Sequence, residues 1–451
     1  MNEHTTRPDI PARAAKPTPV AGVRPRAAFA AVVVLAVSGT LASCGDGGGA
    51  SVPTLTWYTN PDNGGQEALA AKCTEAAGGE YRIEISELPA DASDQREQLV
   101  RRLAANDSSI DLMSLDVVFV PEFAEAGFLR SFSGDEGAGL TRGVLDGPAE
   151  TAVWDDELVA APFWANTQLL WYRSSVAERA GIDPAEGPVT WDDVIDAADQ
   201  TGTTVAMTGG RYEGYMVWIN ALVMSAGGEV LKDPDAGKDA DPELESDAGR
   251  EASDIIHRLA TTVADPALST AIEENARTTF QGDDGGFMVN WPYVYGAART
   301  AVDDGSLDQA VFDDIAWARF PRVDPGRESA PPLGGIDVAV GAFSDHPDEA
   351  VDAVNCITTV ESQIEYMLAE GNPAARAAVF DDPEVREAFP MADLIRDSIN
   401  TAGPRPRSAY YSDVSTATVR EFHPPSGVDP DSTPGNADDL IRNVLQDRQL
   451  L

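Results

Sequence analysis

The stretch that decides the fold lies at residues 154–172 and reads WDDELVAAPFWANTQLLWY. An apolar extended run at 158–161 leads into Pro162 and a polar-aromatic corner, and a second apolar run follows at 169–172. Two strand-like runs joined in this way are typical of a chain that passes between two bodies. The pattern also fits an ordinary hairpin inside one domain, and this stretch taken alone slightly favours the hairpin.

Length and charge restrict the class of protein. The 451 residues are enough for two or three domains, and a hydrophobic content of 43% fits a globular protein. The 75 acidic residues outnumber the 32 basic ones and give a formal net charge of -43. Such a surface repels nucleic-acid phosphates and anionic lipid headgroups, so we expect no nucleic-acid partner and no polybasic contact with a membrane.

The N-terminal region has the composition of an export signal. Residues 1–26 are polar and basic, and the apolar run at 27–37 has the length of a signal-peptide core but is too short to span a bilayer. Small residues then precede Cys44, which resembles the lipobox of bacterial lipoproteins, where this cysteine is lipidated. We expect a lipoprotein signal peptide at 1–43, a lipid-anchored tether at 44–52, and a body at the outer face of the cytoplasmic membrane. A plain secretory signal with a chance cysteine is the alternative.

Two further cysteines, Cys73 and Cys356, fall in segments with a helical pattern. Export places them where a disulfide persists, so we expect a bond between them, with two buried thiols as the alternative. The sequence has no CxxC and no HExxH motif, and its four histidines are scattered. This pattern predicts no metal site, and we expect no cofactor.

The beginning of the mature chain alternates strands with helices. Strand patterns occur at 52–58, 81–88 and 110–116, with helical patterns at 66–77 and 93–105. This alternation predicts an open α/β sheet, in which ligands bind beyond the carboxyl ends of the strands. Asn60 and Asp116 lie at such ends.

The same kinds of pattern return after residue 172. Thr190 and Asp193 form a partial capping box at a helix start. Further helices are predicted at 215–225, 247–260, 273–281, 348–368 and 437–445, and strands at 205–207, 286–290, 316–320 and 335–340. The segments 232–247 and the region from 404 onward are predicted to be rich in loops.

Several motifs resemble one family over nearly the whole mature chain. They are WDDELVAAP at 154–162, PVTWDDV at 188–194, GGE at 227–229 and NWPY at 290–293. In these motifs the chain is similar to the extracellular solute-binding proteins of ABC sugar importers, the maltose-binding-like group, and most of all to actinobacterial trehalose-binding lipoproteins. Asp156 departs from the pattern, because the family often has Gly there, but a turn tolerates Asp.

This resemblance implies an α/β, two-lobed periplasmic-binding-protein fold with a multi-crossing hinge. We assign residues 53–162 and 331–382 to lobe I and residues 163–330 and 383–451 to lobe II. The implied function is capture of a disaccharide, trehalose or a related α-glucoside, and its delivery to the ABC permease. We expect a monomer that performs no covalent chemistry.

A neutral sugar requires carboxylates and amides for its hydroxyls and aromatic faces for its rings. Candidates of these kinds, together with a glycine for close backbone approach and an arginine fork, are Asn60, Gln66, Asp116, Asn166, Glu273, Trp291, Tyr293, Gly335 and Arg405. Each has a structural alternative, such as a helix cap, turn, core or surface role. In trehalose-binding relatives the matching residues line the site, except for Asn60 and Gln66, which rest on their position alone. Glu274 and Arg407 are the alternatives to Glu273 and Arg405.

Three other functions are compatible with parts of the sequence. A secreted glycoside hydrolase would use two carboxylates. Because the chain has 75 acidic residues, the presence of two carboxylates does not indicate a hydrolase. A binding protein for a polyamine, polyol or peptide would also use carboxylates and aromatic rings, although Arg405 argues against a cationic ligand. A structural surface lipoprotein would need no polar residues at strand ends.

Overall fold

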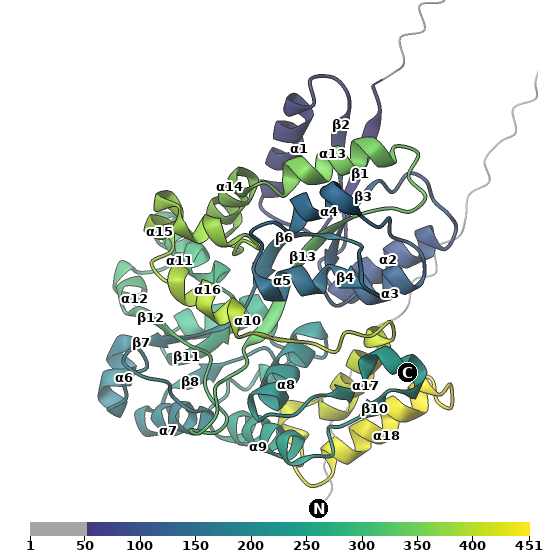
Figure 1. Ribbon diagram of the computed structural model, residues 1–451. Helices are drawn as coiled ribbons and strands as arrows, with labels where there is room; N and C mark the ends of the chain where they lie inside the picture. The colour runs from purple at the N-terminus through teal and green to yellow at the C-terminus, as the bar shows by residue number, and fades with distance from the viewer. Residues whose placement is uncertain (1–51) are drawn as a thin grey trace, which may run out of the picture. The chain divides into compact units, whose positions relative to one another are not determined.

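The structure is a computed structural model that describes residues 52–451 (Figure 1). The predicted signal peptide, the lipidation of Cys44 and the tether lie outside the described residues, apart from residue 52. Within 52–451, no helix combines the length and apolar composition that a membrane crossing requires. Over the same range, no three His, Cys, Asp or Glu side chains gather closely enough to hold a metal ion.

The first sheet has six strands in the order β14-β13-β3-β1-β2, with β6 pairing with β13 as well. Strands β1, β2 and β3 are parallel neighbours, and β13 runs antiparallel to both β3 and β6. The α/β pattern predicted for the beginning of the mature chain is confirmed. The strand bounds are β1 Thr54–Thr59, β2 Arg82–Glu87, β3 Leu112–Asp116, β6 Ala161–Asn166, β13 Pro332–Val340 and β14 Gly403–Pro404.

The second sheet has four strands in the order β12-β7-β11-β8. Strand β7 is buried along its whole length, with β11 and β12 paired to its two edges. The bounds are β7 Leu169–Arg173, β8 Thr204–Ala206, β11 Gly285–Asn290 and β12 Ile315–Ala318.

The stretch at 154–172 passes between the two sheets. Strand β6 belongs to the first sheet and β7 to the second, with only Thr167 and Gln168 between them. The hairpin interpretation is therefore wrong, because the two runs do not pair with each other. The lobe boundary drawn after residue 162 falls inside β6, since this strand pairs with β13 as far as Asn166. Strand β14 was assigned to lobe II, yet it pairs with β13, which was assigned to lobe I.

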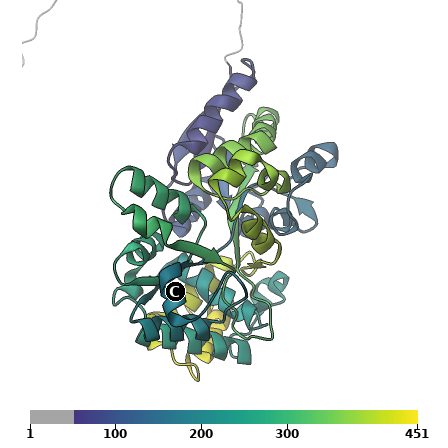
Figure 2. The ribbon, with the colours of Figure 1, turned by 90° about the vertical axis from the view of Figure 1, so that its left-hand side faces the viewer.

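Eighteen α-helices among the described residues surround the sheets (Figures 1 and 2). Up to residue 225 they are α1 Gly65–Ala76, α2 Ala92–Leu103, α3 Val120–Glu125, α4 Gly134–Thr141, α5 Asp146–Thr151, α6 Ser174–Ala180, α7 Trp191–Thr201 and α8 Glu213–Ser225. Beyond it they are α9 Asp247–Thr262, α10 Glu273–Gln281, α11 Tyr293–Asp303, α12 Gln309–Asp313, α13 Pro347–Ile357, α14 Val360–Glu370, α15 Pro383–Ala388, α16 Ala392–Asn400, α17 Tyr411–Phe422 and α18 Thr433–Leu445. Short ladders join β4 Val153–Trp154 to β5 Glu157–Leu158 and β9 Leu231–Lys232 to β10 Asp241–Pro242.

Local capping explains why one predicted helix start is confirmed and why another predicted helix is divided in two. Thr190 and Asp193 form a complete capping box at the start of α7, as predicted. The single helix predicted at 348–368 is wrong, because Thr359 caps a new helix by accepting a hydrogen bond from Ser362 N. The segment 232–247 contains a short ladder, and α17 lies in the region predicted to be loop-rich. Apolar periodicity alone does not reveal a cap inside a continuous apolar pattern.

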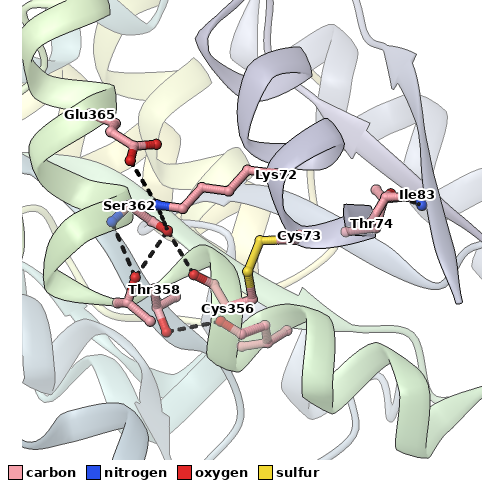
Figure 3. The surroundings of a disulfide bond; sticks show 10 residues. Lys72, Cys73, Thr74, Ile83, Cys356, Thr358, Ser362 and Glu365 are labelled. Atoms are coloured by element: carbon pink, nitrogen blue, oxygen red, sulfur yellow. Dashed lines mark hydrogen bonds and ion pairs between the residues drawn. A yellow bond between two sulfur atoms is a disulfide. The ribbon is translucent and has the colours of Figure 1, made fainter. Parts of the chain in front are cut away.

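The predicted disulfide between Cys73 and Cys356 is present and joins α1 to α13 (Figure 3). The Cα atoms of the two cysteines lie 5.8 Å apart, and 283 residues separate them in the sequence. Beside the disulfide, Lys72 Nζ lies 2.9 Å from Glu365 Oε1 of α14 (Figure 3). These contacts attach the first helix to α13 and α14, which lie beside it in both ribbon views.

Candidate functional site

Strand β13 brings together predicted ligand residues from distant parts of the chain. Its Gly334 pairs with Asn166 at the end of β6, and its Ile336 pairs with Asp116 at the end of β3. Asn166 and Asp116, both predicted to contact a ligand, therefore lie on opposite edges of β13, and their partners on β13 are two residues apart. The sequence alone did not reveal this pairing, because β13 begins more than 160 residues after β6 ends.

The two glycines of β13 allow close approach to this place. Gly335 has a φ of 137°, and a Cβ there would lie 2.4 Å from the carbonyl oxygen of Trp164. A Cβ at Gly334 would lie 3.2 Å from the six-membered ring of Trp291, which therefore packs directly against the strand. The Cβ of Asn166 would lie 3.7 Å from the same added atom, so Trp291 and Asn166 meet at the bare backbone of Gly334.

A buried asparagine positions Trp291. Asn290 at the end of β11 is fully buried, and its Oδ1 accepts a hydrogen bond from Trp291 N at 2.8 Å. Its Nδ2 donates to the carbonyl oxygen of Glu273 at 3.0 Å. One side chain thus fixes both the chain at Trp291 and the start of α10. We did not assign Asn290 from the sequence, although it opens the NWPY motif.

Arg405 forms an ion cluster with two carboxylates. Its Nη2 lies 3.0 Å from Asp116 Oδ1, and its Nη1 lies 2.6 Å from Glu213 Oε1 at the start of α8. The side chain is 3% exposed, and Glu213 accepts further hydrogen bonds from Ser415 Oγ at 2.6 Å and from Tyr411 OH. The guanidinium expected to bind vicinal hydroxyls is therefore bound to protein carboxylates. The signal that could have found Glu213 is a charged residue at the start of a predominantly apolar helix.

Burial controls the charges in this cluster. Burial raises the pKa of the Glu213 carboxyl, while Arg405 and the hydrogen bonds from Ser415 and Tyr411 oppose that rise. In β13, the carboxyl of Asp337, whose residue pairs with Leu115 beside Asp116, is 1% exposed, and burial raises its pKa to about 8. Thr151 Oγ1 donates to Asp337 Oδ2 at 3.1 Å. At neutral pH the Asp337 carboxyl is thus largely uncharged.

The other predicted carboxylate, Glu273, lies beside a tyrosine. Tyr212 OH donates to Glu273 Oε2 at 2.6 Å, and burial followed by the charge of Glu273 raises the pKa of Tyr212. The hydroxyl therefore stays protonated and acts as the donor. Glu274, the alternative to Glu273, is bound by Arg277 with an Nη2 to Oε2 distance of 2.7 Å.

Gln66 has a positioning role. It is 1% exposed, its Nε2 donates to the carbonyl oxygen of Asn60 at 2.8 Å, and its Oε1 accepts from Ser114 Oγ at 3.0 Å. Its amide is thus occupied by the protein, whereas Asn60 Oδ1 has no hydrogen-bond partner within residues 52–451. Arg407, the alternative to Arg405, donates to the backbone carbonyl of Val153.

The crossing segment contributes polar groups that we did not assign from the sequence. Thr167 and Gln168 are at most 1% exposed, and their Oγ1 and Oε1 atoms have no partner in the described part of the chain. Tyr293, the first residue of α11, lines a separate cavity of about 780 Å3. Around β13 the arrangement therefore offers a carboxylate, an amide and the Trp291 indole.

Comparison with known proteins identifies the family. The model for bacterial extracellular solute-binding proteins matches residues 62–364. The chain belongs to this family. A curated relative from Deinococcus radiodurans, named a probable ABC transporter-binding protein, is 25% identical over 348 residues, covering 74% of this chain and 79% of the relative.

Solved structures agree with the two-lobed fold of this family. Maltose-bound MalE3 of T. maritima is 25% identical, with a TM-score of 0.74 over 88% of this chain and 100% of that one. The cyclic alpha-maltosyl-1,6-maltose binding protein of Arthrobacter globiformis is 21% identical, with a TM-score of 0.70 over 88% of this chain and 100% of its own. The predicted two-lobed α/β fold is confirmed.

Membership of this family establishes the general role. The solute-binding protein is an extracellular component of an ABC transporter that binds a ligand and delivers it to the permease subunits. Such components are not enzymes, so the glycoside hydrolase alternative is discarded.

Proposed function

We propose that this solute-binding protein captures a disaccharide, trehalose or a related α-glucoside. The observation that carries the proposal is the grouping of Asp116, Asn166 and Trp291 around the N-terminal half of β13. A carboxylate and an amide there can pair with hydroxyls, and the indole can cover the C–H face of a sugar ring.

The charge of the site supports an uncharged ligand. Arg405 is bound to Asp116 and Glu213, so its charge is already compensated and does not attract a phosphate or carboxylate group. Asp116 Oδ1 accepts from Arg405, whereas Oδ2 has no hydrogen bond to a residue in 52–451. Since the Asp116 side chain is 21% exposed, this second oxygen is available to a ligand hydroxyl.

The connection between the sheets suits closure on a ligand. Asp116 and Asn166 belong to the first sheet, whereas Trp291 follows β11 of the second. A ligand that contacts all three would favour the arrangement in which both sheets present their residues to it. We propose that closure bends the chain at Thr167 and Gln168, and that the monomer, lipid-anchored through Cys44, delivers the sugar to the permease.

The decisive experiment is calorimetric titration of the purified protein with trehalose, maltose and spermidine. We expect saturable binding of trehalose. Binding of another sugar or a polyol but not trehalose would discard the substrate while keeping the sugar-binding site. A response to spermidine alone would mean that the carboxylates act as counter-ions.

Substitutions test the site directly. We expect Trp291→Ala and Asp116→Ala each to weaken sugar binding by at least about 100-fold, because each removes a central contact of a small ligand. Trp154→Ala is the matched control, since this indole belongs to β4 of the short β4–β5 ladder and donates to Glu125. Unchanged affinity in both site variants would contradict the assignment.

A further inference from the structure

Glu213 is a buried carboxylate that the proposed sugar contacts do not include. It is the first residue of α8, and its side chain is 8% exposed. Its Oε1 accepts from Arg405 Nη1 at 2.6 Å and from Tyr411 OH, and its Oε2 accepts from Ser415 Oγ at 2.6 Å. Because protein donors bind both oxygens, Glu213 acts on a ligand only through its partners.

The guanidinium of Arg405 connects Glu213 to a residue proposed to bind the ligand. Its Nη1 and Nη2 atoms lie in one rigid plane, so the bond from Nη1 to Glu213 fixes the direction in which Nη2 donates. Nη2 donates to Asp116 Oδ1 at 3.0 Å. The Arg405 side chain is 3% exposed, so little water competes for these two bonds. The position of Glu213 therefore determines where Asp116 finds its donor.

Two donors orient the carboxylate of Asp116 for a ligand. Its Oδ1 accepts from Arg405 and also from the backbone N of Val118 at 3.2 Å. Within residues 52–451 its Oδ2 accepts no hydrogen bond, and the side chain is 21% exposed. Since a carboxylate is planar, fixing one oxygen also fixes the direction of the other. A hydrogen bond weakens steeply when its angle departs from linear, so this direction affects the bond from a sugar hydroxyl.

This ion cluster connects elements of the two sheets. Asp116 ends β3 of the first sheet, whereas Glu213 begins α8, which follows β8 of the second. Beside the ions, the ring of Tyr411 at the start of α17 meets the ring of Phe119 edge to face, with centroids 6.1 Å apart. The orientation of Asp116 thus depends on helices that follow the second sheet, although Asp116 itself belongs to the first.

We propose that Glu213 is a positioning residue for sugar binding, which acts through Arg405 to hold Asp116 with its Oδ2 toward a ligand hydroxyl. This inference rests on the proposed function, because Asp116 must contact the ligand. At metal sites, loss of a group that orients a ligand residue lowers affinity by about 10- to 100-fold. A neutral hydroxyl interacts more weakly than a metal ion, so we expect the lower end of this range for Glu213.

The test is calorimetric titration of the purified protein with trehalose and with maltose, in a double-mutant cycle of Glu213→Gln and Asp116→Asn. Glu213→Gln keeps the size of the side chain and removes its charge. We expect it to weaken sugar binding about 10-fold in the native protein. Added to Asp116→Asn it should weaken binding by less than about twofold, because Arg405 then no longer holds a carboxylate at position 116.

A second variant and a control separate positioning from general stability. Tyr411→Phe keeps the ring but removes one of the three hydrogen bonds to Glu213, so it should weaken sugar binding about threefold. Asp438→Asn is the control, because Asp438 is also buried but accepts only from the backbone N atoms of Leu244 and Glu245. It should lower stability in urea unfolding and leave the sugar affinity within about twofold.

Three results would overturn the inference. Unchanged affinity in both Glu213→Gln and Tyr411→Phe would leave Glu213 a purely structural role, while the proposed disaccharide site would stand. Equal weakening by Glu213→Gln in the native and Asp116→Asn proteins would mean that Glu213 acts by a route other than Asp116. If the native protein binds neither trehalose nor maltose, the proposed function fails and this inference fails with it.

Discussion

The cluster of Arg405 with Asp116 and Glu213 allows a quantitative prediction for Arg405→Ala. The guanidinium is 3% exposed and the Glu213 side chain 8%, so removal of the cation leaves a nearly inaccessible carboxylate without its counter-ion. Breaking a buried ion pair by removing one partner costs about 3–5 kcal/mol. We expect the lower end, about 3 kcal/mol at pH 7, because Asp116 is 21% exposed and Glu213 keeps its bonds from Ser415 and Tyr411.

The pH dependence of this loss identifies its origin. Burial raises the pKa of Glu213, and Arg405 opposes that rise, so the variant carboxyl takes up a proton at higher pH than the native one. Protonation removes the buried charge in the folded state. The stability lost in Arg405→Ala should therefore be largest at high pH and decrease as the pH falls, because the unpaired Glu213 carboxylate then takes up a proton.

The assay is urea unfolding followed by tryptophan fluorescence at several pH values. Arg386→Ala is the control, because Arg386 also contacts two carboxylates, Asp381 and Asp393, but is 43% exposed. Surface pairs of this kind contribute at most about 1 kcal/mol. Adding Glu213→Gln to Arg405→Ala should recover part of the loss, since it removes the unpaired charge. Equal losses in both arginine variants, or a loss that does not change with pH, would refute this explanation.

Two further predictions concern β13. Gly335→Ala should destabilise the protein by about 2–5 kcal/mol, because the residue has a φ of 137° and its Cβ would collide with the Trp164 carbonyl. Urea unfolding measures this loss, with Gly139→Ala as a control that should not destabilise the protein. Near-native stability of Gly335→Ala would contradict it. For Asp337, the unfolded carboxyl ionises above a pH of about 4, whereas the folded one stays protonated up to about 8. Its contribution therefore makes native stability fall as the pH rises through this window. Asp337→Asn should flatten that dependence in unfolding curves from pH 4 to 9. Identical pH profiles for the variant and the native protein would exclude this role of Asp337.

Local sequence pattern was sufficient for many of the elements. The strands at the beginning of the mature chain, the capping box at Thr190 and the helix at 273–281 follow from periodicity and caps over a few residues. The same reasoning failed between 348 and 368, where the apolar pattern continues across two helices and only the cap at Thr359 separates them. It also missed α17, whose apolar face packs against α18 and α8.

The sequence by itself determined the residue types available for a ligand and the two cysteines that form a disulfide. Only the tertiary structure decided how the candidates are used. Arg405 lies 192 residues from Glu213 and 289 from Asp116, and Gln66 lies 48 residues from Ser114, the residue that occupies its amide oxygen. Sequence patterns report backbone conformation over one or two turns or strands. The partner of a buried polar group depends instead on which distant elements pack together, because most buried polar groups take their hydrogen bonds from neighbouring elements of the fold.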